Sequence, residues 1–443
     1  MRILIDSGSY HALNVGDVAM LQAGIERLRQ LWPDASIAVV TNSPAALATH
    51  CPGVRAVPLS GRVAFRSDRF FGRANDLLPQ RLGAGLDAIH DRMQQRWPAT
   101  LAAIIAGKRA MALRRDWLAA PAYIRALKVA DLVVATGAGV LTDAFLENAT
   151  GVLETLAFAI QRNVPTAAFG QGIGPVSSPA LRRRMSEVLP HLALIALRER
   201  RESVRLLAEI GVHPDRIIVT GDDAIEMASR GARPEFGDAI GVNVRVAGYA
   251  GVTAASAIDV VGPAVRRAAG RLAAPLLAVP IAHHPDCHDG IAIRELLTGG
   301  DDSSAPLVSL DTPARAIAQV SRCRVVVTGS YHAAVFALAQ GIPVVALAAT
   351  RYYVDKFSGL QEFFGDGCRT VVIGSPDAAA DLEAAIVEAW AGAPARREAL
   401  RCAADEQVRR GRNAYQLLGR LIDGRADTGP LPVPRPVSAH LKA

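Results

Sequence analysis

Short apolar segments alternate with longer amphipathic ones along most of the chain. The short segments are continuous runs of Val, Ile, Leu and Ala, as in strands buried on both faces, and the longer segments repeat apolar residues at helical spacing. This alternation predicts an α/β protein with parallel sheets covered by helices. The predicted strands are Arg2–Asp6, Ser36–Thr41, Asp131–Ala135, Thr166–Phe169, Leu194–Leu197, Ile217–Thr220, Ile240–Val244, Pro275–Pro280, Leu307–Leu310, Arg324–Thr328, Val344–Leu347 and Thr370–Ile373. The helical patterns include Asp17–Leu31, Thr142–Arg162 and Arg200–Ile210.

The alternation is interrupted at Ser229–Asp238, a polar segment rich in Gly, Pro and Arg, and then restarts. A chain of 443 residues is also too long for one ordinary core. We therefore predict two Rossmann-like domains that face one cleft. The expected parts are residues 1–230 with a basic helical insertion at 62–120, residues 239–375 as the second domain, residues 376–425 as helices that pack back across the domains, and residues 426–443 as a flexible, proline-rich tail.

Composition narrows the class of protein. Hydrophobic residues make up 50% of the chain and charged residues 21%, which excludes wholesale disorder. The five cysteines are scattered without a CxxC pair, as expected for reduced thiols. The N-terminus begins directly with a strand pattern, and no apolar run is long enough to span a bilayer. A cytoplasmic protein is expected.

The net charge of +7 is concentrated in one segment. Between Arg62 and Asp116, eleven Lys or Arg stand against five Asp, and Phe70, Trp97 and Trp117 lie among them. Basic residues mixed with aromatic ones favour an anionic membrane surface, which makes peripheral association with the inner face of the membrane one interpretation. The alternative is an ordinary solvated helical insertion. Nucleic acid is not an expected partner because no recognised binding motif accompanies the charge.

Residues 328–343 form the most informative motif. The strand pattern that ends at Thr328 is followed by Gly329-Ser330-Tyr331-His332 and an apolar helix. A strand, a tight turn and a helix N-terminus create an anion site, because backbone N–H groups and the helix dipole converge there. The alternative is a structural βαβ corner whose histidine packs or caps.

Three loops in the first half also follow strands or precede helices. Asn14-Val15-Gly16-Asp17 precedes a helix, with Asp17 as a suitable N-cap. Thr136-Gly137-Ala138-Gly139 resembles half of a dinucleotide fingerprint without its third glycine. Gly170-Gln171-Gly172-Ile173-Gly174-Pro175 ends another strand. Each loop alone is ordinary turn chemistry, but three of them at the carboxyl edge of one sheet predict the floor of a cleft.

Together these segments resemble the polysaccharide pyruvyl transferase family, enzymes of the GT-B architecture. The resemblance covers roughly residues 1–365 and rests on the order of the motifs. Besides the loops above, it includes Leu197-Arg198-Glu199 with Ser203, and Thr220-Gly221-Asp222. Where the family reads Arg-Leu-His, this chain has Ser330-Tyr331-His332, so the histidine is kept and the arginine is replaced.

The resemblance implies a transfer of the enolpyruvyl group of phosphoenolpyruvate onto a saccharide or lipid-linked saccharide as a ketal, without a cofactor or metal. It implies that His332 is the acid, and a histidine can deliver the proton that an enol ether needs. Cationic side chains would hold the carboxylate and phosphate in place of the missing arginine. The candidate substrate-binding residues are Asn14, Gly16, Asp17, Gly137, Gly139, Gln171, Arg198, Arg245, His284, Gly329, Ser330, Tyr331, Arg351 and Lys356.

Alternative interpretations remain open at the level of sequence. The segment His283–Asp289 holds several metal-capable side chains, although their spacing is not a standard ligand pattern, so it is a metal site, a substrate contact or a polar loop. A GT-B glycosyltransferase with a nucleotide-sugar donor would use the same fold. A third possibility is a catalytically idle family member that only binds a glycan.

Overall fold

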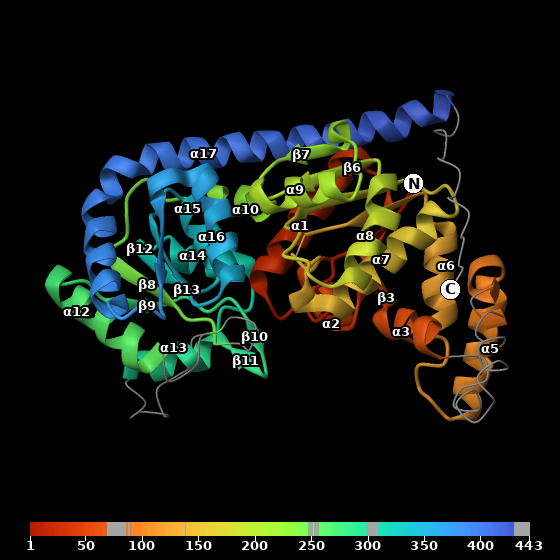
Figure 1. The fold of residues 1–443 in the computed structure, drawn as a ribbon, viewed down its shortest axis with the longest axis horizontal. Helices are drawn as coiled ribbons and strands as arrows, with labels where there is room; N and C mark the ends of the chain where they lie inside the picture. Colours follow the sequence, from red (N-terminus) through yellow and green to blue (C-terminus); the bar gives the residue numbers. More distant parts are fainter. Residues whose placement is uncertain are drawn as a thin grey trace.

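Two parallel sheets lie side by side beneath one long C-terminal helix (Figure 1). The computed structural model describes residues 1–68, 86, 89–90, 92–137, 139–246, 251, 257–298 and 309–428. Within this part of the chain, no helix has both the length and the apolar character that a transmembrane span needs.

The first sheet contains seven parallel strands in the order β3-β2-β1-β4-β5-β6-β7. The strands are β1 (Arg2–Asp6), β2 (Ser36–Thr41), β3 (Arg55–Pro58), β4 (Leu132–Ala135), β5 (Thr166–Gln171), β6 (Leu194–Leu197) and β7 (Ile217–Val219). The helices of this half are α1 (Val15–Leu31), α2 (Pro44–His50), α3 (Leu59–Ser67), α5 (Pro98–Met111), α6 (Ala119–Val129), α7 (Leu146–Ile160), α8 (Pro179–Val188), α9 (Arg201–Glu209) and α10 (Ala224–Arg230).

The second sheet contains five parallel strands in the order β14-β13-β12-β8-β9. They are β8 (Ala239–Asn243), β9 (Leu276–Ala278), β12 (Cys323–Thr328), β13 (Val344–Ala348) and β14 (Cys368–Val372). A small antiparallel hairpin, β10 (His283–His284) and β11 (Cys287–His288), follows β9. The helices are α12 (Gly262–Leu272), α13 (Asp289–Thr298), α14 (Pro313–Val320), α15 (Tyr331–Ala339), α16 (Arg351–Phe364) and α17 (Ala378–Thr428).

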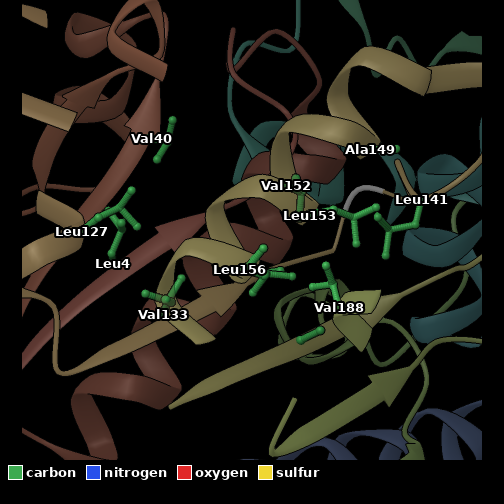
Figure 2. Close-up of a cluster of buried hydrophobic side chains, with 14 of the residues drawn as sticks. Leu4, Val40, Leu127, Val133, Leu141, Ala149, Val152, Leu153, Leu156 and Val188 are labelled. Carbon is green, nitrogen blue, oxygen red and sulfur yellow. The ribbon is translucent and has the colours of Figure 1, made fainter. Parts of the chain in front are cut away.

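Both faces of the first sheet are buried, which explains the continuous apolar strands. In β1, Leu4 packs into the cluster beneath α6 and α7, whereas Ile3 and Ile5 pack on the opposite face against α1 and α17. Figure 2 shows the first of these clusters, in which Leu4 and Val133 of the sheet meet the apolar sides of α6 and α7. The same arrangement in the second sheet leaves the carboxyl ends of the strands as the place for polar side chains.

Helix α17 contacts elements of both halves, including α1, α10 and β6 on one side and α12, α15 and β12 on the other. It runs along the whole upper edge of the molecule in Figure 1. The sequence predicted several terminal helices, but the structure has a single helix with Pro394 inside it. Residues 426–428, expected to be in a flexible tail, belong to this helix, and residues 429–443 lie outside the described part.

The loop after β1 joins the two halves through backbone hydrogen bonds. The N–H of Val15 donates to the carbonyl of Ile281 (3.0 Å), and the N–H of His283 donates to the carbonyl of Leu13 (2.7 Å). Helix α1 therefore begins at this junction. Asn14 is its N-cap, with a side-chain oxygen that accepts from the N–H groups of Gly16 and Asp17, so the expectation that Asp17 caps this helix was wrong.

Three other sequence expectations differ from the structure. Strand β3 was missed because it is short and ends in proline, and the β10–β11 hairpin was missed because each strand has two residues. The predicted strand Leu307–Leu310 lies partly outside the described residues, and Ser309 and Leu310 are not in a strand.

The basic segment is helical where the structure describes it, with α3, α5 and α6 packed on one another. Arg62 does not belong to an exposed basic face, because it is buried and its Nη1 lies 2.7 Å from the Asp6 carboxylate. The turn between α5 and α6 instead exposes apolar side chains, including Met111 (80%) and Leu113 (90%).

Candidate active site

Both sheets reverse their strand order at the junction between the two halves. The reversal lies between β1 and β4 in the first sheet and between β8 and β12 in the second. Ligands of doubly wound α/β proteins bind at such switch points, beyond the carboxyl ends of the strands. Here, loops from both switch points line one cavity of about 420 Å³.

This cavity, which we call cavity 1, brings together nine of the predicted residues. They are Asn14, Asp17, Arg198, Arg245, His284, Ser330, Tyr331, His332 and Lys356. They come from loops after β1, β6, β8, β9 and β12 and from helices α1, α15 and α16. The chain therefore gathers charged and aromatic groups from segments more than 300 positions apart in sequence into one cavity between the sheets.

His332 lies in the first turn of α15 and packs across the start of α1. A Cβ on Gly16 would lie 2.0 Å from Cγ of His332, so only glycine leaves room for the ring. The ring faces two carboxylates: Nδ1 lies 3.7 Å from Oδ1 of Asp17 and Nε2 lies 3.8 Å from Oδ2 of Asp222. Nε2 also lies 3.4 Å from the sulfur of Met20. Gly16 thus acts by making space for His332.

Burial and nearby cations keep the imidazole neutral. The pKa of His332 is well below its ordinary value because the ring is buried and because Arg198 and Lys356 repel a positive charge there. In the ligand-free protein His332 is therefore not charged near neutral pH. A role as acid requires that an anionic ligand first raises its pKa.

Lys356 and Asp222 are also shifted toward neutrality. Burial, assisted by repulsion from Arg198, lowers the pKa of Lys356 to about 7. Its ammonium lies over the rings of Tyr352 (4.7 Å), Tyr331 (5.5 Å) and Tyr353 (5.6 Å), and no described carboxylate forms an ion pair with it. Burial raises the pKa of Asp222 to about 6, and its Oδ2 has no hydrogen-bond partner within the described part of the chain.

Arg198 is buried at the end of β6, with 3% of its side chain exposed. Its Nη1 lies 3.6 Å from Asp222, and its guanidinium stacks 4.3 Å from the centre of the Tyr331 ring. A Cβ on Gly139 would lie 2.1 Å from Nη2, and one on Gly172 would lie 2.7 Å from Nε. The two glycine-rich loops that the sequence suggested for ligand contact therefore leave space for this arginine.

Arg245, in contrast, is engaged by protein groups. Its Nη1 donates to Oδ1 of Asp289 (2.8 Å) and to the carbonyl of Cys287 (3.1 Å). Gly329 packs against it, since a Cβ there would lie 3.1 Å from the Arg245 nitrogen. Ser330 is the N-cap of α15 and makes no side-chain cap hydrogen bond. Its hydroxyl is uncharged, so Ser330 does not replace the charge of the family arginine.

Within the β10–β11 hairpin, the rings of His283 and His288 pack edge-on with centres 5.1 Å apart, and each also has a backbone partner. His283 Nε2 lies 2.9 Å from the carbonyl of Leu310, and His288 Nδ1 accepts from the N–H of Gly290 (3.1 Å). His284 lines cavity 1 and packs edge-on against His11. The described residues contain no group of three or more side chains placed to hold a metal ion.

A second cavity of about 280 Å³, cavity 2, adjoins the first and shares Arg198, Tyr331 and Lys356 with it. Among the predicted residues, Gly139 and Arg351 line cavity 2 only. Gly16, Gly137, Gln171 and Gly329 line neither cavity. Gln171 is buried, and its amide donates to the carbonyls of Ala135 and Phe169, which fixes the ends of β4 and β5.

Several lining residues were not singled out from the sequence. Gly8, Ser9, Tyr10 and His11 line cavity 1 directly after β1, and their position at a strand end was the signal that would have found them. Others come from α7 and α16, as Asn148 and Tyr353 do, and carry no comparable signal.

Comparison with solved structures identifies the class of fold. A UDP-N-acetylglucosamine 2-epimerase-like protein from Listeria monocytogenes aligns with a TM-score of 0.55 and 12% identity, covering 97% of this chain and 98% of that one. S. aureus MnaA, solved with UDP, aligns with a TM-score of 0.53 and 13% identity over 96% and 97% of the chains. The glycosyltransferase of kitacinnamycin aligns with a TM-score of 0.52 and 13% identity over 95% and 98%. The protein has the GT-B architecture of two Rossmann-like domains facing a cleft.

Sequence comparison identifies the family within that class. The family profile of polysaccharide pyruvyl transferases matches residues 14–350. The chain therefore belongs to the polysaccharide pyruvyl transferase family, as its motifs indicated, and is a transferase. A search of curated protein sequences gives no significant match.

Proposed function

We propose that the protein transfers the enolpyruvyl group of phosphoenolpyruvate to two hydroxyls of a saccharide, forming a cyclic ketal and releasing phosphate. The observation that carries this proposal is the state of Arg198 and Lys356. Both line cavity 1, and within the described residues Arg198 donates no side-chain hydrogen bond and Lys356 has no ion pair. A buried arginine whose one carboxylate partner, Asp222, lies at 3.6 Å, beside a half-buried lysine without an ion pair, is suited to a small, highly charged anion.

The donor carries a carboxylate and a phosphate, which would contact Arg198 and Lys356. Burial and, after it, repulsion from Arg198 and Lys356 hold the pKa of His332 low, and the negative charge of the donor would counter both, so that His332 would take up a proton when the donor binds. Asp17 and Asp222, on either side of the ring, would then stabilise the imidazolium. Binding of the donor would in this way create the acid that the reaction needs.

The proposed reaction can be written as a sequence of proton transfers and bond changes. His332 gives its proton to the methylene carbon, and C2 becomes a cation stabilised by its oxygen. One acceptor hydroxyl attacks C2 and loses its proton, the C2–O bond to phosphate breaks with the electron pair on phosphate, and the second hydroxyl closes the ring. In sum, one proton ends on the new methyl group and one on the released phosphate, and His332 returns to its initial state.

The acceptor would occupy the part of cavity 1 formed by the loop after β1 and the β10–β11 hairpin. That side is lined by Ser9, His11, Asn14 and His284, which offer hydrogen-bonding groups for sugar hydroxyls. A saccharide acceptor also agrees with the family. His11, from the loop after β1, and His284, from the β10–β11 hairpin, meet edge-on with ring centres 5.8 Å apart, so both halves of the protein would contribute to the acceptor site.

Turnover with defined donors tests the proposal. The protein is incubated with phosphoenolpyruvate and a panel of aryl glycosides that present free diols, and ³¹P NMR follows the phosphorus species. We expect the enol phosphate to be replaced by inorganic phosphate while a glycoside gains an acidic pyruvyl group. UDP-N-acetylglucosamine is the competing donor, because the MnaA neighbour was solved with UDP. Consumption of the nucleotide sugar instead would establish the glycosyltransferase alternative, and binding without any turnover would favour an idle glycan-binding member.

A lipid-linked acceptor would place the protein at a membrane surface. The turn between α5 and α6 exposes Met111, Leu113 and Leu118, and Lys108, Arg114 and Arg115 lie in the same segment. Apolar side chains beside basic ones suit an anionic lipid surface. We propose that this turn provides the peripheral membrane contact, on the cytoplasmic side.

A further inference from the structure

Cavity 2 lies behind the cationic wall of cavity 1. Arg198, Tyr331 and Lys356 form the partition, since all three line both cavities. The far side of cavity 2 is built from the loop Gly172–Pro175, the start of α9 and the first turns of α16. Any ligand held by Arg198 and Lys356 therefore has access to a second space on the side opposite the proposed acceptor.

The carboxylates of cavity 2 are engaged by protein groups. Glu199 accepts from the N–H groups of Glu202 (3.1 Å) and Ser203 (2.8 Å) at the start of α9. Glu202 pairs with Arg205 (2.7 Å), and Asp355 pairs with Arg351 (2.8 Å). Glu202 and Asp355 are thus paired with arginines, and Glu199 is held by hydrogen bonds at the start of α9.

The cationic side chains of the partition have fewer protein partners than these carboxylates. Among the described residues, Lys356 has no ion-paired carboxylate, and Arg198 has only the long 3.6 Å ion pair with Asp222 and donates no side-chain hydrogen bond. The hydroxyl of Tyr352, a residue that lines cavity 2 only, is buried without a hydrogen-bond partner among the described residues. Its pKa is raised to about 12, chiefly by burial, so it remains a hydrogen-bond donor. Cavity 2 is therefore bordered by a lysine without an ion pair, an arginine with one long ion pair and a hydroxyl without a partner among the described residues, a set that favours an oxyanion.

We propose that cavity 2 is a phosphate site that receives the phosphate group of the donor and retains it as the leaving group, while the acceptor occupies cavity 1. The inference rests on the proposed function, which it refines by assigning the two ends of the donor to opposite sides of the partition. The C2–O bond breaks at Arg198 and Lys356, the electron pair leaves with phosphate, and phosphate departs through cavity 2 without crossing the acceptor. Tyr352 donates a hydrogen bond to a phosphate oxygen.

Adjacent tyrosines provide a matched test. Inorganic phosphate is titrated calorimetrically into the full-length protein at fixed ionic strength, with wild type, Tyr352→Phe and Tyr353→Phe compared. Tyr353 lines cavity 1 only, and its substitution keeps the aromatic ring near Lys356. A hydrogen bond to a charged group corresponds to about tenfold or more in affinity. We expect Tyr352→Phe to weaken phosphate binding by about tenfold and Tyr353→Phe to leave it unchanged.

A second pair of variants tests the rim of cavity 2. Arg351 and Arg315 are both exposed and both pair with an aspartate four positions away at 2.8 Å, but only Arg351 lines the cavity. Arg351→Gln should weaken phosphate binding, whereas Arg315→Gln should not. Tungstate soaked into crystals should appear beside Tyr352. Equal affinities in both pairs, no phosphate binding, or tungstate confined to cavity 1 would each overturn the phosphate site.

These outcomes are distinguishable from failure of the proposed function. If phosphoenolpyruvate is consumed with an acceptor but Tyr352→Phe binds phosphate as wild type does, the transfer stands and cavity 2 is not its phosphate site. If phosphate binds in cavity 2 but phosphoenolpyruvate is neither bound nor consumed, the anion site stands and the proposed donor is wrong.

Discussion

At the scale of single residues, the environment of His332 determines when it can act. Burial, followed by two nearby cations, lowers its pKa, and two carboxylates lie where they can stabilise its charged form. Such opposing influences make the protonation state responsive to a ligand, because an added anion changes the balance. The sequence predicted His332 from its place after β12, but the neutral state could not be predicted, since it depends on burial against α1 and on Arg198 and Lys356 from other segments.

Replacement of His332 by Gln tests its role as acid. The variant keeps a hydrogen-bonding side chain but has no titrating proton, so we expect kcat to fall by roughly a hundredfold to ten-thousandfold while the affinity for phosphoenolpyruvate changes much less. In wild type, kcat should decrease on the alkaline side as the bound-state imidazolium loses its proton, and this limb should vanish in the variant. Turnover near the wild-type level would make His332 structural.

Arg198 and Arg200 provide a matched pair for the donor site. From the sequence alone, the Arg-Glu-Arg-Arg run did not show which of its arginines reaches the site. The structure places Arg198 in the partition and Arg200 in an exposed position outside both cavities. Loss of a charge-assisted hydrogen bond is worth about 1.5–3 kcal/mol. We expect Arg198→Ala to weaken phosphoenolpyruvate binding by about tenfold to a hundredfold in calorimetric titration. Arg200→Ala should bind as wild type does, and equal effects of the two changes would remove Arg198 from the site.

At the scale of elements, the strands could be predicted better than the loops. Continuous apolar runs such as Val325–Val327 are buried on both faces, and that requirement is visible in a single sequence. The glycine loops were correctly seen as unusual, but their partners were not. Gly16, Gly139 and Gly172 accommodate His332 and Arg198, which come from elements distant in the chain. Only the packing of whole elements brings these groups together.

The space beside Gly16 can be tested directly. Gly16→Ala should displace His332, because the added methyl would overlap the ring, and should reduce kcat toward the level of His332→Gln while circular dichroism remains native. Gly107, exposed on the outer face of α5, is the control, since a Cβ there meets nothing within 4 Å. Gly107→Ala should retain full turnover and gain about 0.5–1 kcal/mol of stability from helix propensity. Unchanged turnover in Gly16→Ala would show that the ring position is not critical.

At the scale of the whole molecule, two connections hold the halves together around the cavities. Helix α17 packs on both sheets, and backbone hydrogen bonds join the loop after β1 to the loop after β9. The two-sheet arrangement could be predicted from the restart of the strand pattern after Asp238. The contact of Asn14 with Ala282 could not, because nothing local to either segment specifies it.

The apolar turn between α5 and α6 leads to a prediction about the intact protein. Vesicles that contain phosphatidylglycerol should bind the protein, and binding should weaken as salt rises. Charge reversal of Arg114 and Arg115 to Glu should abolish it in flotation assays, whereas the same reversal of Arg183 and Arg184 on α8 should not. Equal binding to neutral and anionic vesicles would leave the turn as an ordinary solvated surface.

The central claim is that the cationic partition binds phosphoenolpyruvate, and calorimetric titration of this donor into the wild-type protein tests it most directly. Lys356 has a pKa of about 7 and His332 a lower one, so both carry more charge as pH falls. The account predicts saturable binding of phosphoenolpyruvate that is tighter at pH 6.5 than at pH 8.5, and no comparable binding of UDP-N-acetylglucosamine. Binding of the nucleotide sugar without binding of phosphoenolpyruvate would contradict it.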